Sequence, residues 1–124
     1  METLTHEIAA HAARLVVEEG LDYGAAKRRA QKTLGLPPRT ALPDNDLLEA
    51  EVRAYIALFY ADTQPAELAA LRRLALLWMD RLAEFRPHVA GAVWNGTATR
   101  LSDIHLQLFC DAPKSAEIAP IDHR

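Results

Sequence analysis

The chain has 124 residues, half of them hydrophobic, and its 17 acidic against 14 basic residues give a formal net charge of −3. A chain of this length buries one core, or one core with a helical appendage. The acidic balance argues against a protein that coats nucleic acid, because such a protein needs a large basic surface. We therefore do not expect nucleic acid as a partner.

The sequence also indicates a compartment. A single cysteine cannot form a disulfide within the chain, which is typical of proteins in a reducing cytoplasm. Charged residues interrupt residues 1–20, so we expect no signal peptide. No uninterrupted apolar run of about 18 residues occurs, so we expect no membrane association. These features predict a cytoplasmic protein.

Two helices are expected at the N-terminus. Apolar spacing predicts a first helix over residues 3–19, ended by Gly20, and a second from about Asp22 to Gly35. The second helix carries a basic cluster, namely Lys27, Arg28, Arg29 and Lys32. A helix-turn-helix would need a recognition helix directly afterwards, and prolines follow instead, so we interpret the cluster as a solvated helix face. Residues 1–35 are thus a predicted N-terminal helical pair.

Residues 36–45 contain three prolines and predict a loop or linker. Asp44 or Asn45 is expected to cap a third helix over residues 46–61. Thr63 is expected to cap a fourth helix, which ends at Arg86 and Pro87. The predicted inner faces are Leu48, Val52, Tyr55, Ile56 and Phe59 in the third helix, and Leu71, Ala75, Trp78, Leu82 and Phe85 in the fourth.

The aromatic residues are assigned to the core, because the chain has so few of them. Trp94 is expected under the predicted sheet or at its edge. An alternative for Tyr55, Phe59 and Tyr60 is an exposed patch that contacts a partner helix.

After Pro87 the apolar pattern alternates, which predicts short strands over residues 89–94, 104–111 and 116–121. In the middle strand, Ile104, Leu106 and Leu108 share one face. The predicted fold class is α+β: about four N-terminal helices followed by a small three-stranded, mainly antiparallel sheet. Residues 46–124 would hold the last helices and this sheet. Because so small a sheet is marginal, association into a homo-oligomer is expected.

Polar residues that suit phosphate and cation binding lie between the first two predicted strands. Gly96 and Thr97 form a turn whose backbone N–H groups can face a phosphate, because glycine permits close approach. Asp103 and His105, two positions apart on the next strand, project from one face and can share a cation. Ser102 precedes them.

Asp122, on the next predicted strand, can supply a second carboxylate. Two-metal nucleotidyl transfer uses such carboxylate clusters to hold Mg²⁺ and to stabilise the developing charge. The candidate residues are therefore Asp103 and Asp122 for catalysis, Gly96, Thr97 and Ser102 for nucleotide binding, and Asp103 and His105 as metal ligands.

This segment resembles the minimal nucleotidyltransferases of the DNA polymerase beta superfamily, whose signature is Gly-Ser, a short helical arm, and Ser-Asp-x-Asp-Leu on a strand. The resemblance covers roughly residues 87–122. It implies a nucleoside triphosphate as substrate, Mg²⁺ as cofactor and an acceptor of unknown kind. It places the triphosphate at Gly96 and Thr97, the metals at Asp103 and His105, and a third carboxylate at Asp122.

The sequence departs from that signature at two points. The arm between Gly96 and Asp103 is several residues shorter than in the family, and His105 stands in place of the second aspartate. Mg²⁺ prefers oxygen ligands, so a catalytically degenerate domain is an alternative to an active one. The whole chain also resembles a group of bacterial proteins that pair such helices with the segment NGTATRLSDIHLQLFCDAPKSAEI.

The same residues allow two other interpretations. In the first, the Gly-Thr loop joins two antiparallel strands, Ser102 or Asp103 caps a turn, and His105 lies on the wet face of a sheet. The chain is then a non-catalytic helical interaction or regulatory module, with dimerisation expected. The second is a transition-metal site formed by His88, Asp103, His105 and His123.

Overall fold

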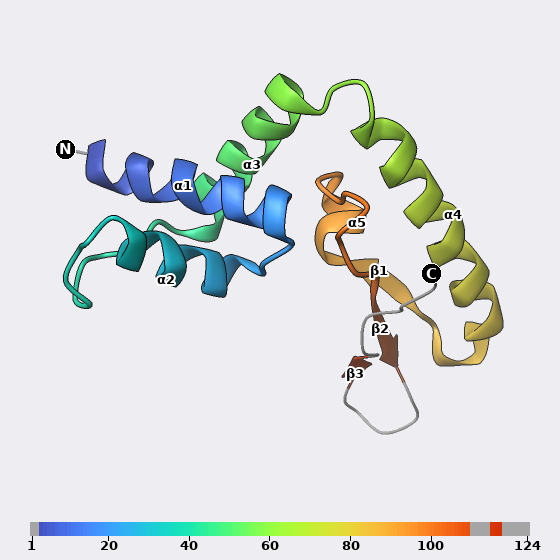
Figure 1. Cartoon of the computed structure of the whole chain (residues 1–124). Helices are drawn as coiled ribbons and strands as arrows, with labels where there is room; N and C mark the ends of the chain where they lie inside the picture. The colour runs from blue at the N-terminus through green and yellow to red at the C-terminus, as the bar shows by residue number, and fades with distance from the viewer. Residues whose placement is uncertain (1–2, 110–114, 118–124) are drawn as a thin grey trace. The chain divides into compact units, whose positions relative to one another are not determined.

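The computed structural model describes residues 3–109 and 115–117, and the chain divides into two compact units between Ala61 and Asp62 (Figure 1). Each unit has its own hydrophobic core. This division differs from the predicted one at residues 36–45, because α3 (Asn45–Phe59) packs on α1 (Thr3–Glu19). Residues 46–61 therefore belong with the N-terminal helices.

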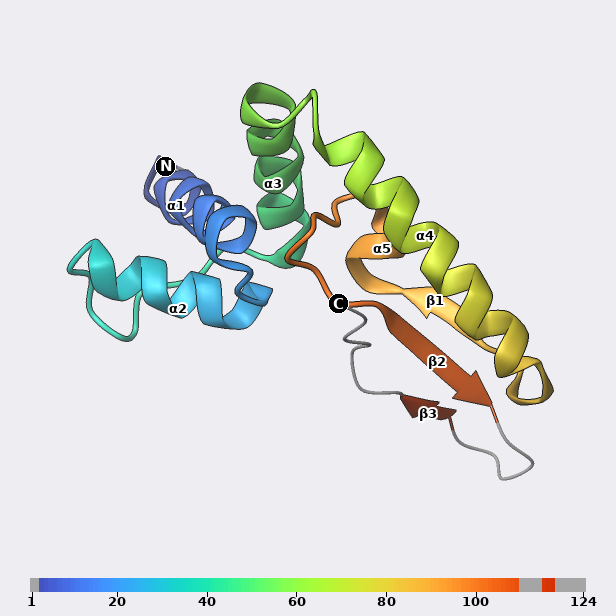
Figure 2. The same ribbon diagram turned by 45° about the vertical axis from the view of Figure 1, so that its right-hand side comes forward.

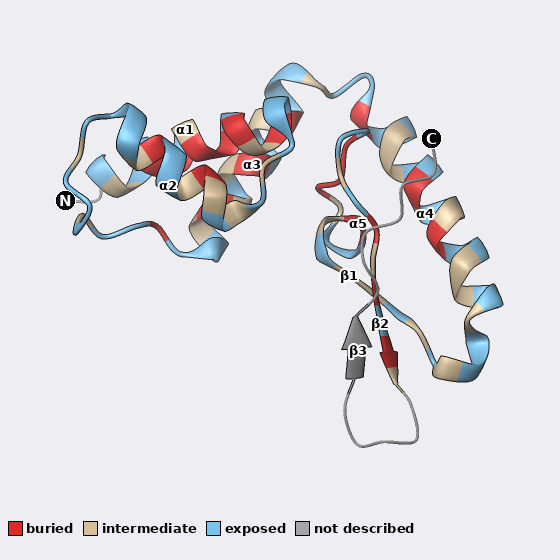
Figure 3. Ribbon diagram, turned by 60° about the horizontal axis from the view of Figure 1, so that its bottom comes forward, coloured by how far each residue is buried: buried red, intermediate tan, exposed pale blue. Residues whose placement is uncertain are grey.

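The first unit consists of α1, α2 (Tyr23–Thr33) and α3, with α1 in contact with both other helices (Figure 1). Figure 3 shows the buried positions of α1 and α3 concentrated where these helices meet. Alanines at the contact faces allow the helices to approach closely. The buried residues of this core are Ile8, Ala12, Ala13, Leu15, Val17, Ala26, Ala30, Leu48, Val52 and Ile56.

Aspartates begin two of these helices. The Asp22 carboxylate accepts a hydrogen bond from the Ala25 N–H at 2.8 Å, and that of Asp44 accepts one from the Leu47 N–H at 2.8 Å. Each bond satisfies a donor that the first helical turn leaves without an intrahelical partner. The expected starts of α2 and α3 are confirmed to within a residue or two.

The proline-rich segment is fastened to α2. The side-chain amide of Gln31 donates to the carbonyls of Pro38 and Thr40 at 3.3 and 3.1 Å, and Lys27 Nζ donates to Asn45 Oδ1 at 2.7 Å. These bonds hold the segment back against the helix that precedes it. Residues 36–45 therefore form a loop of the first unit.

The core assignment of the α3 aromatics needs correction. Phe59 lies at the end of α3 and is 61% exposed, whereas Tyr55 and Tyr60 are partly buried against the first core. The hydroxyls of Tyr55 and Tyr60 both donate to the Glu18 carboxylate, at 2.7 and 2.8 Å. The pKa of Tyr55 is raised to about 12; desolvation of the phenol is the largest cause, and the hydrogen bond to Glu18 is the second.

The second unit consists of one long helix, a short one and a small antiparallel sheet (Figure 2). Its elements are α4 (Gln64–Arg81), the 3₁₀ helix η1 (Ala83–Phe85), β1 (His88–Ala90), α5 (Gly91–Asn95), β2 (His105–Phe109) and β3 (Ser115–Glu117). The strands pair in the order β1-β2-β3. The α+β class, mostly helical with a small antiparallel sheet, is confirmed.

The inner face of the sheet packs against α4 and α5. The register pairs Val89 with Leu106, and Ile104 and Leu106 are fully buried in one core with Leu71, Ala75 and Val93. On the other face, His105 is half-buried and Gln107 is exposed. The expected alternation along this strand is confirmed for residues 104–109; its predicted end at residues 110–111 lies outside the described residues.

The strand predicted over residues 89–94 is wrong beyond Ala90. Gly91 has φ 72°, a left-handed value that ends the strand, and α5 follows. Trp94 consequently lies on a helix and is 67% exposed, rather than under the sheet. No helix in the described part of the chain is both long and apolar enough to cross a bilayer.

Candidate functional site

Two glycines delimit the short helix between β1 and β2. Gly91, at φ 72°, turns the chain from β1 into α5, and Gly96, at φ 89°, ends α5. Residues with a Cβ rarely adopt these left-handed values. The glycines thus set where the helical arm begins and ends between the two strands.

The N–H groups of the Gly96–Thr97 turn are already engaged. Both donate to the carbonyl oxygen of Ala92, at 2.9 Å from Gly96 and 3.0 Å from Thr97. Backbone N–H groups that follow a helix commonly bind a carbonyl of its last turn in this way. The donors that were expected to face a phosphate therefore close α5, and Thr97 itself is buried.

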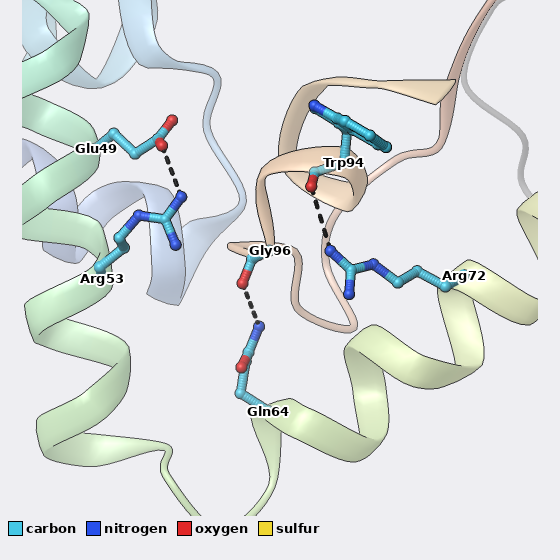
Figure 4. A network of polar contacts seen from close by, with 6 residues as sticks. All are labelled: Glu49, Arg53, Gln64, Arg72, Trp94 and Gly96. Carbon is cyan, nitrogen blue, oxygen red and sulfur yellow. Dashed lines mark hydrogen bonds and ion pairs between the residues drawn. The ribbon is translucent and has the colours of Figure 1, made fainter. Parts of the chain in front are cut away.

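Side chains of α4 hold this turn from the other side (Figure 4). Gln64 Nε2 donates to the carbonyls of Gly96 and Ala98, at 3.2 and 2.7 Å. Arg72 donates to the Val93 carbonyl through Nε at 2.9 Å and to the Trp94 carbonyl through Nη2 at 3.2 Å. Side chains of α4 therefore fix the C-terminal end of α5 and the loop that follows it.

Sequence reasoning missed Gln64 and Arg72. One signal was present, because Gln64 lies seven positions before Leu71 and so falls on the buried stripe of α4, where a polar residue needs a partner. Gln64 is indeed only 7% exposed. Its partners could not be read from the sequence, since Ala98 is 34 positions away.

The loop before β2 is a hydrogen-bonded turn. Ser102 Oγ accepts from the Thr99 N–H at 2.9 Å, and the Ser102 N–H donates to the Thr99 carbonyl at 2.8 Å. The Arg100 N–H donates to Glu67 Oε1, on α4, at 2.9 Å. This arrangement matches the interpretation in which Ser102 caps a turn; a contact of Ser102 with nucleotide stays a prediction.

Asp103 and His105 lie in different surroundings. Asp103 is exposed and precedes β2, whereas His105 is the first residue of the strand and half-buried. The register places His105 opposite Ala90, and its ring lies against Gly91: a Cβ on that glycine would be 3.4 Å from His105 Cδ2. The imidazole therefore covers the turn at which the chain leaves β1.

These donors do not fit a magnesium ion. Within residues 3–109 and 115–117, no group of three or more His, Cys, Asp or Glu side chains could hold a metal. Asp122 and His123 lie outside the described residues. One carboxylate and one imidazole remain, whereas Mg²⁺ requires near-octahedral oxygen coordination and imidazole suits transition metals.

His88 also belongs to the suggested transition-metal site. Its ring contacts residues outside that site. Its Nδ1 lies 2.9 Å from the Arg86 carbonyl oxygen. Its ring packs edge-on against Phe109, with 5.2 Å between the centroids. The imidazole is exposed on the same side of the sheet as that of His105.

Several large apolar side chains are exposed in both units. Leu58 and Phe59 are 74% and 61% exposed at the end of α3, and Leu76 and Leu77 are 66% and 47% exposed on α4. Adjacent exposed apolar residues are more informative than isolated ones, because folded surfaces usually carry single apolar side chains.

Comparison with protein-family models, curated proteins and solved structures finds no match to this chain. The geometry of residues 88–109 and the exposed helix faces are therefore what separate one candidate function from another.

Proposed function

We propose that the second unit is a nucleotidyltransferase-like domain that binds the phosphate group of a nucleotide and lacks the carboxylate pair needed for transfer. One observation carries this proposal: the order of elements from β1 to β2. A strand, a glycine, a short helical arm, a Ser-Asp pair and a second strand follow one another. This order resembles the signature of the superfamily more closely than the residues alone did.

The position of α5 changes which glycine of the chain matches the glycine of the signature. Because α5 spans Gly91–Asn95, the glycine at the start of the helical arm is Gly91, whereas Gly96 follows its end. More residues separate Gly91 from Asp103 than separate Gly96 from Asp103. With Gly91 as the signature glycine, the arm is therefore no longer short for the family. In this alignment Gly91 is the position at which a phosphate approaches the backbone, and its φ of 72° is a value that residues with a side chain rarely adopt.

The same alignment supports a degenerate site. Ala92 takes the place of the serine in the signature, and His105 takes the place of the second aspartate. The site thereby loses a hydroxyl donor and one of two adjacent carboxylates. Transfer that depends on two metals requires those carboxylates, so we propose binding without nucleotidyl transfer.

Amide chemical shifts test this proposal. We expect ATP, GTP, CTP or UTP, titrated in MgCl₂ or in EDTA, to cause saturable shifts concentrated in residues 91–97 and 103–106. The basic cluster on α2 is the internal comparison, since Arg28 is exposed and attracts any polyanion. Shifts confined to residues 27–32, or no shift with any nucleotide, would contradict the proposal.

A helical interaction module is the second candidate, favoured by the exposed pairs on α3 and α4. Leu76 and Leu77 are adjacent on α4, and two leucines in contact with water form a surface that a partner helix or a second copy can cover. Sedimentation equilibrium of the wild type and of a Leu76→Glu, Leu77→Glu variant tests it. Concentration-dependent association that the variant abolishes is expected; a monomer at every concentration argues against self-association.

A further inference from the structure

Two opposite faces of α4 are apolar. One of them, which includes Leu71 and Ala75, is buried in the core of the second unit. At about 3.6 residues per turn, the residues opposite this buried face are mostly alanine and leucine, and all of them are exposed. They form what we call the outer face of α4: Ala66, Ala69, Ala70, Arg73, Leu76, Leu77 and Asp80.

The outer face has the composition of a covered surface. A helix on the surface of a protein ordinarily carries polar residues opposite its buried stripe, whereas a helix that is apolar all round is ordinarily covered on both sides. Leu76 and Leu77, the large apolar side chains of the outer face, are nevertheless 66% and 47% exposed. We therefore expect a partner to cover them.

The two charged residues of the outer face indicate which partner fits. Arg73 and Asp80 are about two helical turns apart, and the midpoint between them is also the midpoint between Leu76 and Leu77. Neither forms an ion pair within residues 3–109 and 115–117. A second α4 placed antiparallel about that midpoint would bring the leucines together and set each Arg73 beside Asp80 of the other copy. A parallel copy would instead bring Arg73 against Arg73.

The neighbouring arginines of α4 do not oppose this pairing. Arg72 and Arg81 flank the outer face, but both side chains interact with their own unit. Arg72 donates to the carbonyls of Val93 and Trp94 at 2.9 and 3.2 Å, and the guanidinium of Arg81 lies 5.1 Å from the ring centroid of Trp78. Their positive charges therefore stay at the edges of the contact.

We propose that α4 pairs antiparallel with α4 of a second copy of this chain, with Leu76 and Leu77 at the centre and Arg73 of each copy beside Asp80 of the other. This inference rests on the second candidate function, the helical interaction module, and names its partner. Removal of the leucines from water supplies the attraction, and the two charge pairs select the direction and register. The same surface is used by both copies, so the contact closes as a dimer.

Opposite charge reversals, measured by sedimentation equilibrium of the full chain, test the pairing. The wild type is expected to form a reversible dimer. Arg73→Glu alone creates two acidic pairs across the contact, and Asp80→Arg alone creates two basic pairs. Each is expected to weaken association at least about tenfold, because like charges in a contact repel. An equimolar mixture of the two variants is expected to recover association, because every pair is then of opposite charge.

Two controls separate this role from an effect on folding. Arg39→Glu makes the same charge change at an exposed loop position of the first unit, and it is expected to associate like the wild type. Glutamate and arginine are both good helix formers, so the variants of α4 are expected to keep the helix, with circular dichroism as the check.

The results that overturn the inference differ from those that overturn the second candidate function. A wild-type dimer whose charge variants do not recover association on mixing rejects the antiparallel pairing and leaves the interaction module in place. A wild type that stays monomeric up to about 1 mM protein rejects the pairing with a second copy, while the module can still bind a helix of another protein. A dimer that persists in Leu76→Glu, Leu77→Glu rejects both the inference and the role of these leucines as the binding surface.

Discussion

Tyr55 and Tyr60 share one acceptor, the carboxylate of Glu18, across the contact between α1 and α3. An ionised Tyr55 would face that negative charge, so the protonated phenol is favoured in the folded state. Partial desolvation acts in the same direction and is the larger cause, and together they raise the pKa of Tyr55 from 10.0 to about 12.

This shift predicts a loss of stability at high pH. The folded state holds the phenol proton more tightly than the unfolded state, so the contribution is complete below pH 10 and is lost as the pH rises through about 12. In phenolate absorbance, Tyr55→Phe is expected to remove a titration step near pH 12. Glu18→Gln is expected to lower the pKa toward 10. An unchanged last step in Glu18→Gln would contradict the role of Glu18.

Gln64 is a buried polar residue whose side chain holds the carbonyls on either side of Thr97. Gln64→Leu keeps a similar size but leaves the carbonyls of Gly96 and Ala98 without their donor. We expect a loss of about 1–3 kcal/mol in the free energy of unfolding, measured by urea denaturation. Gln107→Leu on the exposed face of β2 is the control, with an expected change within about 0.5 kcal/mol. Equal losses in both variants would reject this role for Gln64.

At the scale of elements, the starts of α3 and α4 differ. Asp44 caps α3 through its side chain, whereas Thr63 occupies the N-cap of α4 with a backbone near the helical region, φ −111° and ψ −32°, and forms no side-chain cap bond. Both were expected to act as caps. The sequence predicted that both residues stand at the N-cap of a helix. It could not predict which of them forms a side-chain cap bond, since that bond depends on the backbone angles at the cap.

Alanine at these two positions separates the effects. Asp44→Ala is expected to cost about 1 kcal/mol, because the Leu47 N–H loses its acceptor. Thr63→Ala is expected to cost only a few tenths of a kcal/mol, because no side-chain cap bond is lost. Thermal or urea denaturation of the two variants measures the difference. A larger cost for Thr63→Ala than for Asp44→Ala would contradict it.

The element that carries the proposed site, α5, was predicted as strand. Ala92, Val93 and Trp94 form a short apolar run, for which strand and helix cannot be told apart by periodicity. The helix depends on the left-handed turn at Gly91 and on the bonds from Arg72 to its last carbonyls. The roles given to Gly96 and Thr97 depended on N–H donors that α5 uses, and the candidate site itself stays a prediction.

At the scale of the whole molecule, the chain builds two cores rather than one. Leu48 belongs to the first core and Leu106 to the second, and both are fully buried. Two separate cores in so short a chain bury less apolar surface each, so each unit depends on few large side chains.

Matched core substitutions test this division. Leu48→Ala and Leu106→Ala are each expected to cost about 2–5 kcal/mol locally. Hydrogen exchange followed by mass spectrometry is expected to show the larger loss of protection in residues 3–61 for the first variant and in residues 62–109 for the second. Equal loss across both ranges in either variant would indicate a single cooperative core.

The sequence by itself determined the helices of the first unit, the aspartate at the start of α3 and the alternation of β2. These features depend on apolar spacing and on hydrogen bonds between residues a few positions apart, such as Asp44 and Leu47. The place of Asp122 in the site stays a prediction. Only the tertiary structure decided the boundary after Ala61, the exposure of Trp94 and the turn held by Gln64. Each of these depends on contacts between residues far apart in the chain, and local sequence patterns do not specify such contacts.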